Sequence, residues 1–459
     1  MPSRVKLGVI GAGSATFSVG VVKDICLQES LAGSHVTLMD VNPDRLEPML
    51  RFGERYAREL GADVTFDMTT EREEALREAD FVLNTAQYGG HDFVEGLRAW
   101  TEEQGYYRGF RINDVLNIRV MLSVARDMQR LCPDAWLIQA GNPVFEGCTA
   151  MTRETGIKVC GICHGHHGYR ELAETMGLDP DRVTAQAVGF NHCIWLTHFE
   201  YEGRDALPLI DEWIAEKSEQ YWREHRPEYW DNQMAKAAVE LYKLAGLFPI
   251  GDTTRRGGWW FHTSLETKKR WYGEELGGFD SEIGWGVYLR GLDEEVGRIH
   301  AAVSDSKAKL TEVFRPEPTG EQHFPLIDAL VNDNRVELQV NVPNRGAIEG
   351  IPDDVVVEVP SMCSARGIQP YHVGALPELL MVSVLRPRLL EAERTISLSV
   401  HPDFRMLMAM ILDDHRTKSY EQAVQFGRDL LARPGLEAVA EQMRRPRPGG
   451  GERGPNAFF

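Results

Sequence analysis

The stretch that most constrains this chain is a strand followed at once by a glycine-rich turn, close to the N-terminus. Val5 to Ile10 is an apolar-leaning run typical of a buried strand, and Gly11-Ala12-Gly13-Ser14 follows it directly. An amphipathic helical pattern comes next, and a second strand from His35 to Met39 ends at Asp40. Strand, glycine turn, helix, strand and acidic residue, in this order, are typical of a dinucleotide-binding βαβ unit.

The residues of this unit have predicted roles at the cofactor. Gly11 permits the tight turn, and Gly13 lets the backbone approach the pyrophosphate. Ser14 opens the helix whose N-terminus faces the phosphates. Asp40 is placed to bind a ribose hydroxyl, which favours NAD over its phosphorylated form. Thr16 stands where a third glycine is expected, but that glycine serves only the packing of helix on strand.

Strand and helix patterns alternate up to about Gly161, which predicts a doubly wound parallel sheet. One strand, Asp80 to Thr85, ends in a polar, glycine-bearing loop. Open α/β sheets bind ligands at such strand ends, so we expect Asn84 to contact the cofactor. Another strand, Trp136 to Gln139, leads to Asn142. The predicted N-terminal Rossmann-like domain spans residues 1–195.

The pattern changes after Trp195, where helical, charge-rich stretches dominate. Glu337 to Val342 and Asp354 to Val359 are interpreted as strands of a second, smaller sheet. We therefore predict an α/β fold whose C-terminal part, residues 196–445, is an α+β domain with substrate, metal and oligomer contacts. Residues 446–459 are rich in proline and glycine and are predicted to be a disordered tail.

Composition narrows the class of partner and the compartment. The chain has 459 residues, enough for two or three fused lobes, and its formal net charge of −19 argues against nucleic acid. No apolar run is long enough to cross a bilayer. The 7 cysteines are scattered and odd in number, which is typical of a reducing compartment and not of a disulfide framework. We expect a cytoplasmic protein that acts on a small molecule.

A cysteine and several histidines follow the strand that ends near Cys160. Cys163 and three histidines, beginning with His164, lie between glycines, and Asn191-His192 follows another apolar run. A cysteine and a histidine presented from two strand ends can hold one divalent metal ion. The alternative is that Cys163 is a small buried hydrophobe and that the histidines form a solvated loop.

A further segment, residues 248–262, is too polar for a core helix and too aromatic for a solvated linker. It carries Asp252, Arg255, Arg256 and His262 beside two tryptophans. Aromatic rings beside charged groups suit a sugar site, because rings stack on the pyranose and polar groups bind its hydroxyls. The alternative is an arginine-rich loop that packs on the first domain.

Together these segments resemble the family 4 glycoside hydrolases, which depend on NAD and a metal and do not use the usual pair of carboxylates. The resemblance covers nearly the whole chain, up to about residue 430. Cys-His-Gly-His resembles the branch of α-glucosidases and α-glucuronidases acting on unphosphorylated sugars, whereas phospho-sugar branches carry Cys-Asp or Cys-Asn. The matching blocks are Gly8 to Ser14, Asn142-Pro143, Cys163 to His166, Gly189 to His192, Pro249 to Thr253, Gly346 to Ile348 and Val355 to Pro360.

The resemblance implies roles for single residues. Cys163 and His192 would bind Mn²⁺, with substrate oxygens completing its coordination. Asp252 would be the base that removes the proton from sugar C2. His164 would protonate the leaving oxygen, or would serve only as a hydrogen-bonding neighbour. Asn142 would bind the sugar or the ligands of the metal, unless it only caps its strand.

The other predicted substrate contacts are Asn191, Arg255, Arg256 and His262. Arg255 and Arg256 would bind the carboxylate of a uronate, which a neutral sugar does not need. A tyrosine, such as Tyr106 or Tyr272, is the alternative to Asp252 as the base.

By the same resemblance, the reaction is hydrolysis of an α-glycoside with NAD⁺ recycled. NAD⁺ oxidises sugar C3, a base removes the C2 proton, the glycosidic oxygen is eliminated, water adds, and NADH returns the hydride. An α-glucoside is the leading substrate; α-glucuronides, α-galacturonides and α-galactosides are alternatives. A lactate/malate-type dehydrogenase and a non-catalytic NAD-binding sensor are the rival classes. We expect a homodimer or homotetramer.

Overall fold

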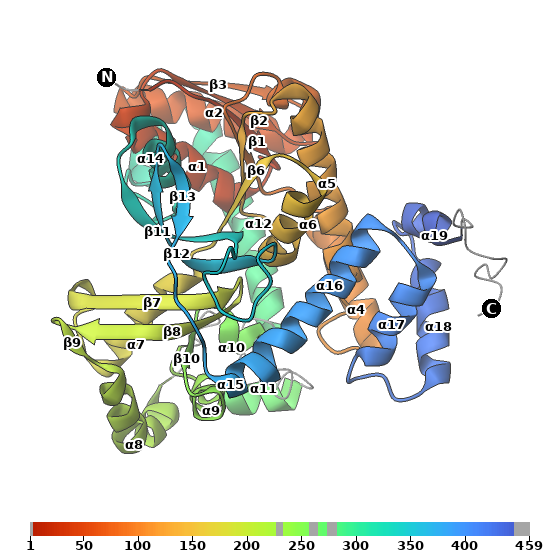
Figure 1. The fold of residues 1–459 in the computed structure, drawn as a ribbon. Helices are drawn as coiled ribbons and strands as arrows, with labels where there is room; N and C mark the ends of the chain where they lie inside the picture. The colour runs from red at the N-terminus through yellow and green to blue at the C-terminus, as the bar shows by residue number, and fades with distance from the viewer. Residues whose placement is uncertain (1–2, 226–232, 257–264, 273–281, 445–459) are drawn as a thin grey trace.

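The computed structural model describes the chain except for residues 1–2, 226–232, 257–264, 273–281 and 445–459. The described residues build one mixed sheet with helices packed around it, which confirms the predicted α/β fold (Figure 1). The strand order is β10-β8-β7-β12-β11-β6-β5-β4-β1-β2-β3. His262 and the predicted tail at 446–459 lie outside the described residues.

The N-terminal part of the sheet is parallel throughout. From β6 to β3 every neighbouring pair of strands is parallel, in the order β6-β5-β4-β1-β2-β3. This is the strand order of a doubly wound, dinucleotide-binding sheet. The strands are β1 (Lys6–Ile10), β2 (Ser34–Met39), β3 (Val64–Thr69), β4 (Phe81–Asn84), β5 (Trp136–Gln139) and β6 (Lys158–Ile162).

Helices connect the parallel strands, and local sequence explains where α2 (Pro43–Leu60) begins and ends. The side chain of Asn42 accepts a hydrogen bond from the backbone N–H of Asp44 at 3.0 Å, and a proline occupies the first helical position. Gly61 ends the helix in the left-handed conformation, with φ of 67°. The other connecting helices are α1 (Ala15–Leu27), α3 (Arg72–Leu76), α4 (Gly90–Glu103), α5 (Ile112–Leu131) and α6 (Val144–Glu154).

Antiparallel strands extend the same sheet beyond β6, so the prediction of a second, smaller sheet was wrong. β11 (Val336–Pro343) pairs with β6, and β12 (Val356–Ser364) pairs with β11 and β7. The reason is that β6 would otherwise leave its backbone N–H and C=O groups unpaired at the sheet edge. The remaining strands are β7 (Val183–Phe190), β8 (Cys193–Tyr201), β9 (Arg204–Asp205), β10 (Phe248–Ile250) and β13 (Gly367–Pro370). The boundary placed at residue 195 falls inside β8.

A group of helices stands apart from the sheet at the C-terminal end. α16 (Arg386–Val400) packs along α5 and α6, and it leads to α17, α18 and α19, at the right of Figure 1. The core of this group is partly aromatic, since Phe426 stacks on Tyr106 with ring centroids 4.1 Å apart. The further helices are α8 (Leu207–Glu224), α9 (Lys236–Ala245), α10 (Thr253–Arg256), α11 (Leu265–Tyr272), α12 (Glu282–Ser304), α13 (Leu310–Val313), α14 (His323–Asn332), α15 (Glu378–Leu380), α17 (Phe404–Asp413), α18 (Tyr420–Leu431) and α19 (Glu437–Arg444).

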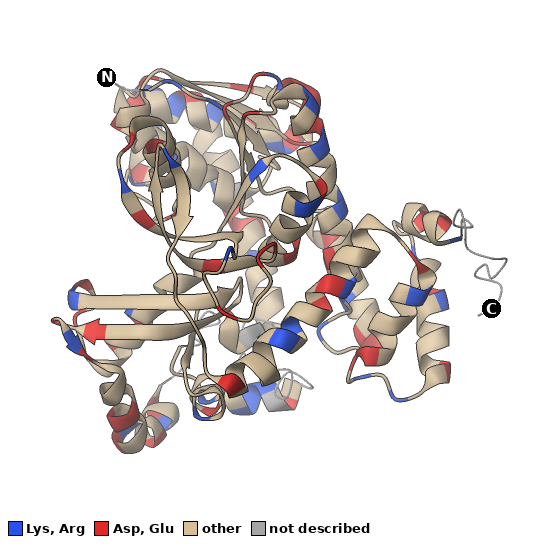
Figure 2. Cartoon of the chain, in the orientation of Figure 1, with Lys and Arg blue, Asp and Glu red and all other residues tan. Residues whose placement is uncertain are grey.

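Charged residues of both signs are interspersed over the outer helices, whereas β7 carries neither kind (Figure 2). Within the described part of the chain, no helix is long and apolar enough to cross a membrane.

Candidate active site

One row of paired residues crosses the middle of the sheet and organises the site. The row runs from β6 through β11, β12, β7 and β8 to β10, and its members are Gly161, Asn341, Glu358, Gly189, Ile194 and Ile250. Residues paired across antiparallel strands point to the same face of a sheet. The side chains of Asn341 and Glu358 therefore stand side by side, with a glycine on either flank.

Four of the predicted site residues lie two positions beyond members of this row. Cys163 follows Gly161, Asn191 follows Gly189, His192 precedes Ile194, and Asp252 follows Ile250. These four residues belong to three segments that are separate in the sequence. The strand register brings these segments to one end of the central strands.

Asn191 and His192 form the tight connection between β7 and β8. His192 has a φ of 59°, a left-handed backbone conformation that is uncommon for residues other than glycine. Such conformations gather at functional sites, where the surrounding structure holds them. Nε2 of His192 lies 3.1 Å from Oδ2 of Asp252, and the two side chains are 14% and 23% exposed. The predicted base and one predicted metal ligand are therefore in direct contact.

The segment that carries Asp252 is held from both sides. The hydroxyl of Thr253 accepts from the backbone N–H of Ile194 at 2.7 Å and donates to the C=O of Ile194 at 2.9 Å. Gly251 packs on Gly165 so closely that a Cβ at residue 251 would lie 2.4 Å from the Gly165 carbonyl oxygen. Because its φ is 59°, Gly251 also adopts a conformation that suits glycine. A side chain at 251 would push the Asp252 segment away from the Cys163 loop.

Cys163 is half-buried at the start of its loop, and its electrostatic surroundings connect it with the other site residues. Burial raises the pKa of the Cys163 thiol, and the carboxyl groups of Glu358 and Asp252 raise it further. The backbone of Gly165 and the side chain of Asn191 act in the opposite direction and lower the pKa of the thiol. A cysteine in these surroundings is a thiol unless a bound cation stabilises the thiolate.

The loop that carries His164, His166 and His167 is exposed to solvent only in part, so the alternative interpretation of a solvated loop describes it incompletely. Burial lowers the pKa of His166 to about 3, and its Nδ1 lies 3.2 Å from the carbonyl oxygen of Cys163. His166 therefore helps to hold the loop. The side chain of His164 is 73% exposed, and its Nδ1 lies 2.9 Å from Oε1 of Glu321. This geometry is compatible with either predicted role of His164, which stays a prediction.

The donor set fits a metal site with two protein ligands. Asp252 contacts His192, and strand register brings Cys163 to the same end of the central strands. Among the described residues, no three His, Cys, Asp or Glu side chains gather as a metal-binding group. The prediction from the sequence named only two ligands, Cys163 and His192, with substrate oxygens as the others. It stays a prediction.

The glycine turn after β1 has the geometry that a dinucleotide site needs. Gly11 has a φ of 90°, and a Cβ there would lie 2.6 Å from the backbone nitrogen of Ala86. The backbone N–H of Gly13 donates to Oδ2 of Asp40 at 2.9 Å, and the N–H of Asn42 donates to Oδ1 at 3.0 Å. The carboxylate of Asp40 is thus fixed beside the turn, and Ser14 follows as the residue that precedes α1.

Two predicted contact residues are buried and have partners within the sheet. Asn84 is fully buried, and its Nδ2 donates to Oε1 of Gln139 at 2.8 Å, so it links the ends of β4 and β5. Asn191 is 3% exposed, and its Nδ2 donates to Oε2 of Glu358 at 2.9 Å. Buried amides need such partners, and the contacts of Asn84 with the cofactor and of Asn191 with the substrate stay predictions.

The structure describes the side chains of some of the remaining predicted site residues but not of others. Asn142 is exposed at the end of β5. Arg255 and Arg256 lie in α10, and their side chains, like the whole of His262, are outside what the structure describes. Tyr106, an alternative base, is fully buried, and its hydroxyl lies 2.9 Å from that of Thr417. Tyr106 is therefore remote from solvent.

Reasoning from the sequence missed Glu358, Asn341 and Glu321. The first two had a detectable signal: Glu358 interrupts the apolar run Val355 to Val359, and Asn341 is one of two amides that alternate with apolar residues from Leu338 to Val342. Charged residues are almost never fully buried unless they have partners. Glu321 had no such signal, because it lies in a polar loop whose position only the fold decides.

The parallel strand order and the glycine turn define an α/β protein of Rossmann type, to which antiparallel strands and further helices are added. Residues 6–178 match the family 4 glycosyl hydrolases, and residues 187–417 match the C-terminal domain of the same family. The chain belongs to the family 4 glycosyl hydrolases. This membership decides against a lactate/malate-type dehydrogenase and against a non-catalytic sensor.

Known proteins similar to this chain cover most of its length. An alpha-galactosidase of Bacillus subtilis (strain 168) is 28% identical over 392 residues, which are 82% of this chain and 85% of that protein. An alpha-galacturonidase of Thermoanaerobacter italicus is 24% identical over 432 residues, or 89% and 91%. A solved 6-phospho-alpha-glucosidase from gut microorganisms, in complex with NAD and Mn²⁺, has a TM-score of 0.75 at 17% identity and covers 94% of this chain and 98% of that chain. This last likeness shows a shared fold.

Proposed function

We infer that the chain is an α-glycosidase that uses NAD⁺ and Mn²⁺ and acts on unphosphorylated sugars. The observation that carries the proposal is that strand register brings Cys163, His192 and Asp252 to one end of the central strands, where His192 contacts Asp252. A solved protein of the same fold is in complex with both cofactors. The glycine turn at Gly11 and Gly13 would hold the dinucleotide, and Cys163 and His192 would hold the metal.

The proposed chemistry divides between the cofactors and the chain. When bound, NAD⁺ supplies a reversible hydride acceptor for sugar C3, and Mn²⁺ supplies polarisation of the resulting ketone. Asp252 takes the proton from C2, because its carboxylate lies beside the metal ligand His192. His164 donates a proton to the leaving oxygen, and Glu321, 2.9 Å from its Nδ1, orients the ring.

The sugar is proposed from the Cys163-His164 pair and from the relatives. His164 follows the cysteine, as in the branch that acts on unphosphorylated sugars, so an α-glucoside is the leading substrate. α-Galactosides and α-galacturonides are the second candidates, because two relatives are named for these activities. Arg255 and Arg256 are the candidates for binding the carboxylate of a uronate, whether a galacturonide or a glucuronide.

A substrate screen tests the proposal. The 4-nitrophenyl α-glucoside, α-galactoside, α-glucuronide and α-galacturonide are each incubated with the protein, NAD⁺, Mn²⁺ and thiol. Release of nitrophenol from at least one of them, and its loss in chelator or after removal of nucleotide, is the expected result. Full activity in chelator would overturn the proposal, and net accumulation of NADH would indicate an ordinary dehydrogenase.

A further inference from the structure

The carboxyl group of Glu358 lies at the centre of the site but has no role in the reaction described above. Glu358 is 1% exposed on β12, paired with Asn341 on one side and with Gly189 on the other. These two neighbours in the sheet are uncharged, so neither neutralises the carboxylate of Glu358. Burial raises the pKa of Glu358 to about 7, and the hydrogen bonds from Asn191 and Asn341 oppose this rise.

The buried side chains of Glu358, Asn191 and Asn341 meet in the middle of the sheet. Oε2 of Glu358 accepts from Nδ2 of Asn191 at 2.9 Å and from Nδ2 of Asn341 at 3.4 Å. Oε1 of Glu358 and Oδ1 of Asn341 have no hydrogen-bond partner among the described residues. A buried acceptor without a partner is costly and is retained where a site needs it. Simple packing of the sheet would be better served by an apolar residue at 358.

The contact of Glu358 with Asn191 leads to a predicted metal ligand. Asn191, whose amide donates to Glu358, directly precedes His192 in the connection between β7 and β8. His192 has a left-handed backbone conformation, with φ of 59°, which the surrounding structure must hold in place. A change at residue 358 would thus be transmitted to His192 by way of Asn191.

We propose that Glu358 is a positioning residue for the metal site, acting through Asn191: its carboxyl group anchors the Asn191 amide, which in turn holds the β7–β8 connection that presents His192. The proposal rests on the proposed function, because it takes Cys163 and His192 as the metal ligands. Groups that orient metal ligands in this way typically change metal affinity about 10- to 100-fold when they are replaced.

The test is a titration of the full-length protein with Mn²⁺, followed by the electron paramagnetic resonance signal of the free ion. Glu358→Gln keeps the size of the side chain and replaces a charge-assisted acceptor with a weaker one. Asn191→Ala removes the connecting amide. Each variant is expected to bind Mn²⁺ about tenfold more weakly than wild type. Melting temperatures measured in chelator show whether each variant folds.

A double variant and a matched control make the proposal specific. If Glu358 acts through Asn191, the double variant Glu358→Gln/Asn191→Ala binds Mn²⁺ no more weakly than Asn191→Ala alone. Glu337→Gln removes the same charge from an exposed position on β11 and should leave the Mn²⁺ affinity unchanged.

The outcomes separate this proposal from the proposed function. Wild-type affinity in a folded Glu358→Gln variant or in Asn191→Ala would overturn the role of Glu358 while the metal site stands. Losses that multiply in the double variant would also overturn it, because Glu358 would then act independently of Asn191. If wild type bound no Mn²⁺, or if Cys163→Ser left Mn²⁺ binding unchanged, both the metal site and the role of Glu358 would be overturned.

Discussion

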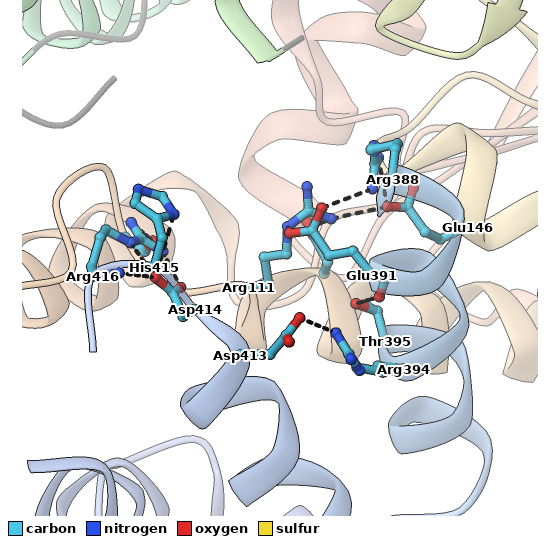
Figure 3. Close-up of polar contacts among 12 residues, drawn as sticks. Arg111, Glu146, Arg388, Glu391, Arg394, Thr395, Asp413, Asp414, His415 and Arg416 are labelled. Atoms are coloured by element: carbon cyan, nitrogen blue, oxygen red, sulfur yellow. Dashed lines mark hydrogen bonds and ion pairs between the residues drawn. The ribbon is translucent and has the colours of Figure 1, made fainter. Parts of the chain in front are cut away.

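Two buried polar clusters of this protein are built on opposite principles. At the centre of the sheet, Glu358 is surrounded by amides and glycines and faces no basic side chain in its row. Between α6 and α16, the carboxylate of Glu146 is contacted by two arginines, Arg111 and Arg388 (Figure 3). Both carboxylates are 1% exposed, so burial does not distinguish them.

In the cluster between the helices, the buried carboxylate has basic partners. Oε1 of Glu146 lies 2.7 Å from Nη2 of Arg388 and 3.1 Å from Nη1 of Arg111. Glu391 forms a further ion pair with Nε of Arg111. Arg388 also lies over the ring of Phe145, 5.3 Å from its centroid, and Phe145 stacks on Phe190 of β7. This cluster therefore joins the C-terminal helices to the sheet.

The two clusters illustrate two different roles of a buried carboxylate. Burying a carboxylate beside arginines costs desolvation free energy, and the ion pairs offset this cost. Such a cluster fixes one helix against another. An unmatched carboxyl group next to a thiol and a second carboxylate stores unfavourable electrostatic energy that a bound cation would relieve. Changes at the sheet cluster should therefore alter metal binding and turnover, whereas changes at the helix cluster should alter stability.

The largest expected effect comes from removing a metal ligand. Cys163→Ser and His192→Ala should each abolish Mn²⁺-dependent glycosidase activity, because one remaining protein ligand holds the ion too weakly. Neither side chain is part of the hydrophobic core, so the melting temperature in chelator should stay close to that of wild type. Activity assays over a range of Mn²⁺ concentrations check this, and wild-type metal affinity in either variant would mean that the ligands lie elsewhere.

The next largest effect is expected at the base. Asp252→Asn should lower turnover by about 10²–10⁴-fold with little change in substrate binding, because it removes a general base. In D₂O, wild-type product should carry deuterium at C2, and the variant should lose this exchange while bound NADH is still detectable. Full C2 exchange in Asp252→Asn would assign the base to another residue, and Tyr272 would be the next candidate.

A smaller effect, and on stability alone, is expected in the helix cluster. Glu146→Gln removes the buried carboxylate that Arg111 and Arg388 share and should cost ~3 kcal/mol in the free energy of unfolding. Unfolding in urea measures this cost. The Mn²⁺ affinity of the folded variant should match that of wild type, and a loss of metal binding would erase the distinction between the two clusters.

The smallest effect is expected at a surface ion pair of the same helix. Arg394 of α16 pairs with Asp413, which is 58% exposed. Arg394→Gln should change the free energy of unfolding by less than ~1 kcal/mol, because solvent and salt screen such pairs. Urea unfolding at low and high salt provides the check, and a cost similar to that of Glu146→Gln would show that exposure does not separate these ion pairs.

The sequence by itself determined the parallel part of the fold. Gly11, Gly13 and Asp40 could be interpreted because the turn, the helix and the strands that present them are contiguous, and short-range periodicity predicts them well. The start of α2 at Asn42-Pro43 has the same local character, since a capping side chain acts on its own neighbours. Family resemblance then singled out Cys163, His192 and Asp252 from separate blocks.

Only the tertiary structure decided how the later strands are paired and what lies beneath the site. That β11 and β12 join the parallel sheet depends on hydrogen bonds between residues far apart in the chain, such as Asn341 and Gly161, which no local pattern specifies. The inward orientation of Asn84 and Asn191 follows from partners supplied by other strands. The position of Glu358 was open for the same reason: the residues that face a buried carboxyl group are chosen by strand register, and register is a property of the folded sheet.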